Sequence, residues 1–344
     1  MSSHVLRIGL VGGLGHTVKF GRLINSFPES MTAVIWDTDE ERGQKNAAEL
    51  NIPFEPDYER VINDYHLDAA VITAENALHR QLCVKAADKG ISLFVEKPLS
   101  VVPQEAYDVR DAVNRNHIKF YMSDPFIRSA DFAIMNMIRE GILGKITGAT
   151  FRIGSNAVLE NLALLDRNRM MGGIMADIGG HMLHKAYYFF GRPEAVKSVM
   201  TSWSDGAKNN NVEDNMIAIL EYPGGVLVSM ECSWIDGGEA SYEAVYGSKG
   251  SALAIRNSDA AGKDSVTLLT GRRIEHEIPE DQIPDNPTQH IRYFIRMLSE
   301  DLPNDIVGQD PKSNSGVSID HAVEYAEIID AIYRAAEAGG EIRL

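Results

Sequence analysis

The chain has 344 residues, more than a single hydrophobic core usually supports, so we expect two domains. Apolar residues make up 44% of it and charged residues 24%, as in ordinary soluble globular proteins. A formal net charge of −16 and the lack of any Lys/Arg run argue against a nucleic-acid partner, because neutralising phosphates requires a basic patch.

The start of the chain and its cysteines favour a reduced, cytoplasmic protein. No basic region followed by a long apolar stretch opens the sequence, and no window approaches the ~18 apolar residues of a membrane helix. We therefore expect no membrane association. Cys83 and Cys232 are far apart and form no CxxC pattern, which favours two buried, reduced thiols.

Strand-like and helix-like segments alternate over the first third of the chain. The short apolar runs have the composition of buried strands, and the segments between them have helical periodicity. In chain order, we expect strands near 5–11, 33–36, 69–73 and 91–95, with helices near 20–27, 39–50 and 79–89. This order predicts right-handed βαβ units and a parallel sheet.

The pattern changes after about residue 125. Residues 226–234 alternate between apolar and more polar side chains, as expected for a strand with one buried face. Pro223-Gly224-Gly225 joins this strand to 216–222 in a predicted hairpin. Further strands are expected near 147–154, 195–203, 242–247, 251–256, 264–269 and 274–278, and a long helix closes the chain. These elements predict a mostly antiparallel sheet.

A glycine-rich turn ends the first predicted strand. Gly12, Gly13 and Gly15 surround Leu14 where the strand passes into a helix, and glycine there lets the backbone approach a pyrophosphate. The spacing matches GxGxxG only in part, so a merely tight turn remains the alternative. Asp37 follows the second strand near the position of a ribose-binding acid, where a carboxylate favours NAD over NADP. The alternative for Asp37 is the N-cap of the next helix.

Two clusters carry most of the functional signal. Val95-Glu96-Lys97-Pro98 follows the strand near 91–95, and by itself it could be a solvated turn. Gly172-Gly173-Ile174-Met175-Ala176-Asp177-Ile178-Gly179-Gly180-His181 lies downstream. Together they resemble the glucose–fructose oxidoreductase/inositol dehydrogenase family, whose fingerprints are EKP after the Rossmann core and GGG-x-x-x-D-x-G-x-H. Weaker matches at residues 76–79, 141–146, 212–215 and 331–339 extend the resemblance along the chain.

The resemblance implies a doubly wound Rossmann domain over residues 1–123 and an α+β domain with a large, open antiparallel sheet over 124–344. It implies NAD(P) as cofactor, a cis peptide at Lys97-Pro98, no metal, and a homodimer or homotetramer formed through the sheet. It places Thr73, Asn76, His79, Glu96 and Lys97 in the cofactor site with the glycine turn and Asp37. Asp177, His181 and His184 on one helix could instead suggest a metal site, but no further Cys/His cluster supports that.

The sequence departs from the family pattern at three places near the expected active site. Ala74-Glu75 replaces Thr-Pro, Ser123-Asp124-Pro125-Phe126 lacks a common arginine, and His184 stands where an acid is common. Asp124 and His184 are therefore candidate substrate contacts.

Oxidising an alcohol with a nicotinamide requires a base, and histidine titrates nearest neutrality. We expect His181 to be this base, Asp177 to orient it or bind a substrate hydroxyl, and Lys97 to stabilise the developing alkoxide. Without the family match, a core histidine and a helix-capping Asp177 would be the simpler interpretations.

The sequence therefore predicts an NAD(P)-dependent oxidoreductase acting on a secondary hydroxyl of a sugar, polyol or related small molecule. Two alternatives stay open: an NAD-dependent glycoside hydrolase of the same family, and a non-catalytic protein that senses dinucleotide and sugar. The pairing of Lys97 with His181 argues against the sensor.

Overall fold

The computed structural model describes residues 4–124, 127–156, 162–238, 240–256, 265–277, 286–307 and 316–344. The chain divides into two compact units, Met1–Pro125 with Asp285–Ala326, and Phe126–Pro284 with Glu327–Leu344. The predicted boundary after residue 123 falls close to the first division. The predicted second domain, however, included 285–326, which packs with the first unit.

The first unit is built on a five-stranded sheet of order β2-β1-β3-β4-β5, parallel at every pairing. Its strands are β1 (Leu6–Val11), β2 (Ser30–Trp36), β3 (Ala69–Ile72), β4 (Ser92–Glu96) and β5 (Phe120–Ser123). Its helices are α1 (Thr17–Ser26), α2 (Glu40–Leu50), α3 (Tyr58–Asp64), α4 (His79–Ala87), α5 (Pro103–Asn116) and α11 (Asn286–Ser299), with short turns η1 (Asn76–Leu78) and η6 (Asn304–Ile306). This confirms the predicted doubly wound fold.

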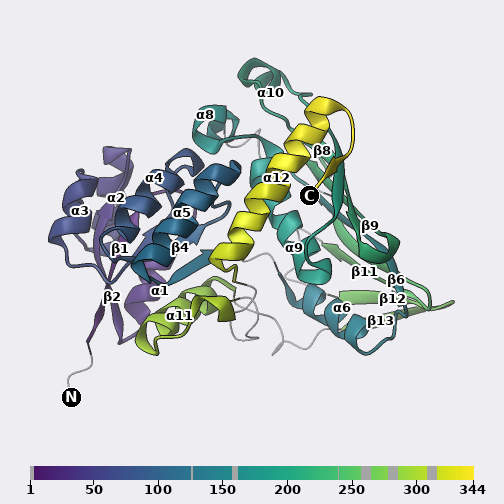
Figure 1. Cartoon of the computed structure of the whole chain (residues 1–344), viewed down its shortest axis with the longest axis horizontal. Coiled ribbons are helices and arrows are strands. Elements are labelled where there is room, and N and C mark those ends of the chain that lie inside the picture. The colour runs from purple at the N-terminus through teal and green to yellow at the C-terminus, as the bar shows by residue number, and fades with distance from the viewer. Residues whose placement is uncertain are drawn as a thin grey trace. The chain divides into compact units, whose positions relative to one another are not determined.

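Helices cover both faces of this sheet. The strand order and right-handed crossovers put α1 on the face opposite α4 and α5, and α11 packs beside α1 (Figure 1). Phe94 stacks on Tyr121 with ring centroids 5.4 Å apart, and Phe294 of α11 lies 5.5 Å from Phe94. These buried rings explain why the segment 285–326 belongs to the first unit: α11 supplies apolar side chains that its core requires.

The second unit contains a nine-stranded sheet of order β13-β12-β11-β10-β6-β9-β8-β7-β14. The strands are β6 (Ile146–Gly154), β7 (Ala195–Thr201), β8 (Asn215–Tyr222), β9 (Val226–Ser233), β10 (Ser241–Gly247), β11 (Ser251–Arg256), β12 (Ser265–Leu269), β13 (Arg273–Glu277) and β14 (Ile342–Arg343). All neighbours are antiparallel except β6 and β9, which confirms the predicted mostly antiparallel sheet.

Helices α6 (Ser129–Arg139), α9 (Gly180–Phe190) and the later part of α12 (Ile319–Ala338) lie on the same side of this sheet (Figure 1). The short elements are α8 (Arg167–Met170), α10 (Asp205–Asn210), η2 (Leu162–Leu165), the π-helical turn η3 (Met175–Gly179) and η4 (Pro223–Gly225). The predicted hairpin is confirmed, because β8 and β9 pair up to Tyr222 and Val226 around η4. In β9, Val228, Met230 and Cys232 are buried while Leu227 is 52% exposed, as the alternation predicted.

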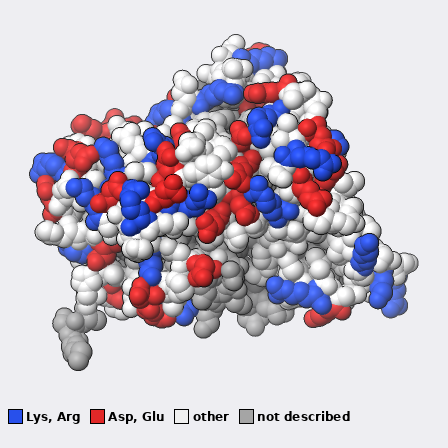
Figure 2. Space-filling model, viewed as in Figure 1, with Lys and Arg blue, Asp and Glu red and all other residues white. Residues whose placement is uncertain are grey.

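Three surface and core properties bear on function. On the face seen in Figure 2, Lys and Arg are interspersed with Asp and Glu. None of the described helices is long and apolar enough to cross a membrane. Cys83 and Cys232 are both buried, and burial raises the pKa of each thiol.

Candidate active site

The candidate cofactor site of the first unit lies at the carboxyl edge of the parallel sheet. The strand order reverses between β1 and β3, and ligands of doubly wound sheets bind at this reversal, beyond the strand ends. Val11 and Ile72 end these two strands, and Glu96 ends β4. Because the strands are parallel, the segments that follow them meet at one edge.

The glycine turn has the geometry of a pyrophosphate site. Gly12 has φ +101°, and a Cβ on it would lie 2.3 Å from the backbone nitrogen of Ala74, so only glycine lets the turn pack against the segment after β3. Thr17, the first residue of α1, lies with its Oγ1 2.7 Å from Oγ1 of Thr73. The first turn of α1 carries no acidic residue. Its amide groups therefore fit an anion.

Asp37 lies against this turn and does not cap a helix. The N-cap of α2 is Asp39, whose carboxylate accepts a hydrogen bond from the backbone nitrogen of Arg42 at 3.0 Å. Asp37 is 3% exposed, and a Cβ on Gly13 would lie 1.9 Å from its Oδ2. The N-cap interpretation of Asp37 is thereby excluded, and the carboxylate faces the glycine turn.

Arg42 and Glu75 complete this corner, and neither was identified as a cofactor residue from the sequence. The Arg42 guanidinium donates to both Asp37 oxygens, its Nε lying 2.7 Å from Oδ2, and this hydrogen bonding raises the pKa of Arg42. Glu75 is 4% exposed, accepts from Thr38 Oγ1 at 3.1 Å and lies 3.6 Å from Arg42. Two carboxylates and one guanidinium give the corner a net negative charge.

The Glu96-Lys97-Pro98 segment is held by a buried histidine. The Lys97-Pro98 bond is cis, as predicted. His79 is 1% exposed, with Nδ1 2.9 Å from the Pro98 carbonyl oxygen and Nε2 3.1 Å from that of Ala74. Burial lowers the pKa of His79. Its imidazole therefore joins the segments after β3 and β4 and acts on the site through their backbones.

The remaining residues predicted for this edge occupy buried positions. Thr73 and Asn76 follow β3 and are 2% and 6% exposed. Asp124, 1% exposed, directly follows β5, while Pro125 and Phe126 lie outside the described residues. Leu14 lies in the glycine turn before α1.

The candidate functional residues of the second unit lie on the helical segment η3–α9. Its start is fixed by Glu213, whose Oε1 accepts hydrogen bonds from the backbone nitrogens of Gly173 at 2.9 Å and Met175 at 3.1 Å. Tyr333 of α12 donates to the same oxygen at 2.7 Å. Glu213 stands in a segment that matched the family pattern, but its role emerges only from these contacts.

Asp177 lies in a π-helical turn, and His181 follows this turn. Asp177 lies within η3, and His181 is the second residue of α9; both are half-buried. A π turn inside a helix is rare and often accompanies a functional site. His184 is 4% exposed, so it belongs to the packed side of α9. Among the described residues, no group of three or more His, Cys, Asp or Glu is arranged to hold a metal ion.

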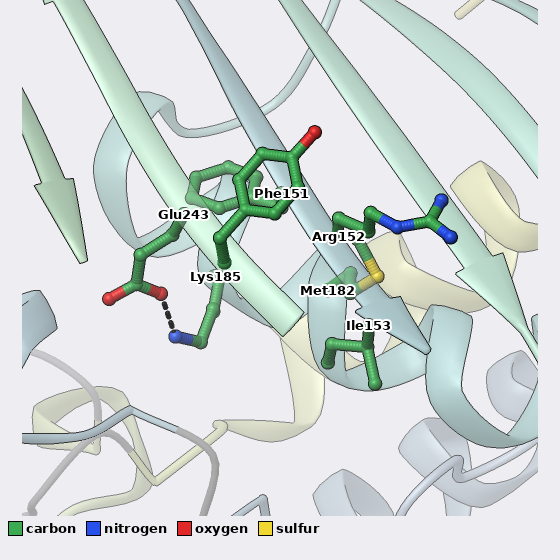
Figure 3. Close-up of a pocket in the computed structure, with 7 residues that line it drawn as sticks. Phe151, Arg152, Ile153, Met182, Lys185 and Glu243 are labelled. Atoms are coloured by element: carbon green, nitrogen blue, oxygen red, sulfur yellow. Dashed lines mark hydrogen bonds and ion pairs between the residues drawn. The ribbon is translucent and has the colours of Figure 1, made fainter. Parts of the chain in front are cut away.

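A buried ion cluster anchors the same helix. Lys185 Nζ lies 2.8 Å from both oxygens of Asp131 on α6. It also donates to Glu243 on β10 (Figure 3). Lys185 is 3% exposed, beside a cavity of about 10 Å³ lined in part by Phe151 and Met182. This cluster was missed, although a lysine inside the apolar run 182–190 was the signal. It fixes α9 against both α6 and the sheet.

These features together define a class. A glycine turn at the reversal point of a doubly wound sheet is typical of dinucleotide-binding proteins. Family models agree: residues 6–123 match the oxidoreductase family with the NAD-binding Rossmann fold, and residues 133–253 match the GFO/IDH/MocA C-terminal domain. The chain belongs to the GFO/IDH/MocA family of oxidoreductases.

Similar proteins span nearly the whole chain. D-xylose 1-dehydrogenase (NADP(+)) 2 of Haloferax volcanii is 26% identical over 98% of this chain and 100% of its own length. The 2,7-anhydro-N-acetylneuraminate hydratase of Escherichia coli is 23% identical over 80% of this chain and 74% of its own. A levoglucosan dehydrogenase structure with NADH and levoglucosan has a TM-score of 0.81 at 20% identity, covering 98% and 99% of the two chains. At that identity the likeness shows the fold alone.

Proposed function

We propose that the protein catalyses the reversible oxidation of a secondary hydroxyl of a sugar, polyol or related small molecule. The observation that carries this proposal is the arrangement at the carboxyl edge of the parallel sheet. There the glycine turn and the Glu96-Lys97 pair are joined by the 3.2 Å contact between His16 Nδ1 and Glu96 Oε1. The names of relatives, which include a xylose dehydrogenase, support the substrate class.

The residues of this chain divide the chemistry among them. A bound nicotinamide supplies the hydride acceptor. Lys97 places a positive charge at the substrate oxygen and favours the alkoxide. His181 takes the hydroxyl proton, and Asp177 orients the imidazole or binds a second hydroxyl. The reaction requires the carbinol carbon within roughly 3–3.5 Å of the nicotinamide C4, so substrate positioning contributes as much as acid–base chemistry.

For the cofactor, we propose NAD in preference to NADP. The carboxylates of Asp37 and Glu75 outnumber Arg42 beside the glycine turn, so a 2′-phosphate would enter a negative corner. Arg42 is the opposing feature, because an arginine near this position accommodates a 2′-phosphate in NADP enzymes. Its pairing with Asp37 occupies the guanidinium, which supports NAD.

A substrate screen tests the proposal. Sugars and polyols are incubated with the protein and NAD, and NADH is followed by absorbance, with Lys97→Ala as the matched inactive control. We expect at least one compound to give NADH with the wild type and a greatly reduced rate with the variant. Equal rates for both proteins would remove Lys97 from the mechanism. Absence of NADH across the panel would contradict net oxidation.

A redox-neutral reaction is the second candidate. It is favoured by one relative, which is named a hydratase. In such a cycle the hydride is taken from the substrate and later returned, so no NADH accumulates. Product formation by chromatography without any NADH signal, and dependence of that product on added NAD, would distinguish it from the dehydrogenase.

We also propose that the protein forms a homodimer or homotetramer through the nine-stranded sheet. One face of this sheet exposes large apolar side chains, namely Val199, Ile217, Ile219, Leu227, Tyr246, Ile255 and Leu269, which are 40–68% exposed. The strand registers place all seven on one face. Exposed apolar surface of this kind usually marks an interface.

A further inference from the structure

His16 connects the two cofactor motifs of the first unit. It is the residue between the glycine turn and α1, and its Nδ1 lies 3.2 Å from Oε1 of Glu96, the last residue of β4. Its ring also meets the buried ring of Phe20 edge-on, with centroids 5.7 Å apart. The imidazole is thus fixed on one side by an aromatic ring and on the other by a carboxylate.

The exposure of the pair leaves it open to a ligand. The His16 side chain is 49% exposed, whereas that of Glu96 is 17% exposed. His16 therefore has one face free of the packed core, at the helix N-terminus where a pyrophosphate would lie.

We propose that His16 is a further binding and positioning residue of the cofactor site. Its imidazole holds the Glu96 carboxylate beside the glycine turn, and its protonated form adds positive charge where the cofactor pyrophosphate binds. The inference rests on the proposed function only in assigning this turn to a dinucleotide.

The charges around His16 support this role. Glu96 faces it from β4, Lys97 follows on the same segment, and Lys19 lies on α1. The hydrogen bond to Glu96 raises the pKa of His16, while burial and the two lysines oppose this. These three neighbours sum to one positive charge when His16 is neutral and to two with the imidazolium. A doubly negative pyrophosphate therefore binds better to the protonated form.

The same contact bears on Lys97. Glu96 precedes Lys97 directly, so a hydrogen bond that fixes the Glu96 side chain also restricts the backbone from which Lys97 extends. His79 restrains that backbone from the other side, at the Pro98 carbonyl. Together the two histidines hold the segment at both ends.

The direction of the pH dependence follows from linkage. A ligand that binds the imidazolium better raises the pKa of His16 further, so affinity is highest at low pH and declines as pH rises through the already raised pKa of His16. A solvent-exposed charge pair typically contributes up to about 1 kcal/mol, so we expect a decline of about threefold to fivefold.

ADP-ribose is the probe for this test, because it carries the pyrophosphate but no nicotinamide. Its binding is measured by calorimetry between about pH 5.5 and 9 at constant ionic strength. Wild type should lose affinity about threefold to fivefold across this range. His16→Gln should bind weakly at every pH, whereas His16→Lys should bind tightly at every pH.

His4→Gln is the matched control. His4 is an exposed histidine paired with Asp68 at 2.9 Å, and the two residues precede β1 and β3 at the amino edge of the same sheet. This variant should keep the wild-type pH dependence. Persistence of that dependence in His16→Gln would overturn the proposal.

A second readout needs no ligand. The titration of the His16 ring, followed by NMR in the free protein, should shift to lower pH in Glu96→Gln, because the hydrogen bond to a carboxylate is lost. An unchanged titration would overturn the positioning role. If ADP-ribose fails to bind wild type at any pH, the dinucleotide site itself is refuted, and the NMR result still decides the His16–Glu96 contact. A negative substrate screen leaves both measurements interpretable.

Discussion

The two sheets of this protein differ in how many of their faces are covered by helices. The parallel sheet has helices on both faces, and its strands are almost uninterrupted runs of buried apolar residues, such as Ala69–Ile72 in β3. The nine-stranded sheet has its described helices on one face, where it also buries the charged Lys185 cluster, and it leaves apolar side chains exposed on the other face.

The coverage of its two faces determines which part of each sheet is open to a ligand or a partner. When both faces are covered, only the carboxyl edge of a parallel sheet is available, and the cofactor motifs lie there. An open antiparallel sheet offers a whole face for association, while the helix on its covered face carries Asp177 and His181. We expect measurable consequences of this contrast, the largest of them in the second unit.

The buried ion cluster should be the most sensitive point of the second unit. Lys185→Ala leaves Asp131 and Glu243 buried without their cation, so we expect a loss of about 3–5 kcal/mol in the free energy of unfolding. Lys197→Ala is the matched control, since Lys197 also pairs with two carboxylates, Glu221 and Glu341, but is 48% exposed. Lys197→Ala should lose much less stability, because water screens an exposed ion pair. Urea denaturation measures both free energies of unfolding. Equal losses in the two variants would show that burial of the Lys185 cluster does not contribute to its effect on stability.

The proposed catalytic roles of Lys97 and His181 predict the next largest effect. His181→Ala and Lys97→Ala should each lower kcat about a hundredfold or more, the usual scale for a positioned acid–base group or electrostatic stabiliser. The double variant should lose less than the product of the two, because both groups act on one substrate oxygen. Steady-state kinetics with the alcohol and NAD measures kcat. The affinity for NAD, which both variants should retain, is the control.

Catalysis by His181 also predicts that kcat/KM for alcohol oxidation rises with pH, since the base must be neutral. If His181→Ala keeps most of its activity at every pH tested, the histidine is structural. His184, one helical turn away, would then be tested next.

The exposed face of the nine-stranded sheet should govern assembly. Ile217→Glu places a charge on this face, and we expect about thirtyfold weaker association, roughly 2 kcal/mol. Val5→Glu is the control, because Val5 is an apolar residue of the first unit that is also exposed, at 40%. It should leave the strength of association unchanged. Light scattering at micromolar concentration provides the measurement. A monomeric wild type would contradict the oligomer outright.

The smallest effect concerns cofactor choice at the edge of the parallel sheet. We expect NAD to bind at least tenfold tighter than NADP, about 1.4 kcal/mol. Asp37→Ala and Glu75→Gln should narrow this preference, whereas Arg42→Ala should widen it by removing the cation that would hold a 2′-phosphate. Calorimetry with both cofactors measures the difference. Equal affinities in the wild type would remove Asp37 from this role.

Much of the fold followed from local patterns. The strands of both sheets were predicted within a few residues, because a buried parallel strand is continuously apolar and a half-covered strand alternates. The place of α11 was not predictable in this way. Its amphipathic pattern specifies a buried face but not the sheet against which that face packs, and its contacts with β5 join residues far apart in the chain.

The candidate site residues likewise divide into those predicted by local motifs and those placed by long-range contacts. Local motifs predicted the glycine turn, Asp37, Glu96-Lys97 and the Asp177–His181 segment, since the residue types of each motif suit its chemistry. Three contacts depend instead on how the chain packs: Arg42 pairs with Asp37, Glu213 holds the start of η3, and His16 meets Glu96. The last two contacts join residues 40 and 80 positions apart, and Arg42 meets Asp37 only because α2 turns back after β2. The physical reason is that side-chain hydrogen bonds depend on distances of a few ångströms, which packing fixes and sequence spacing does not.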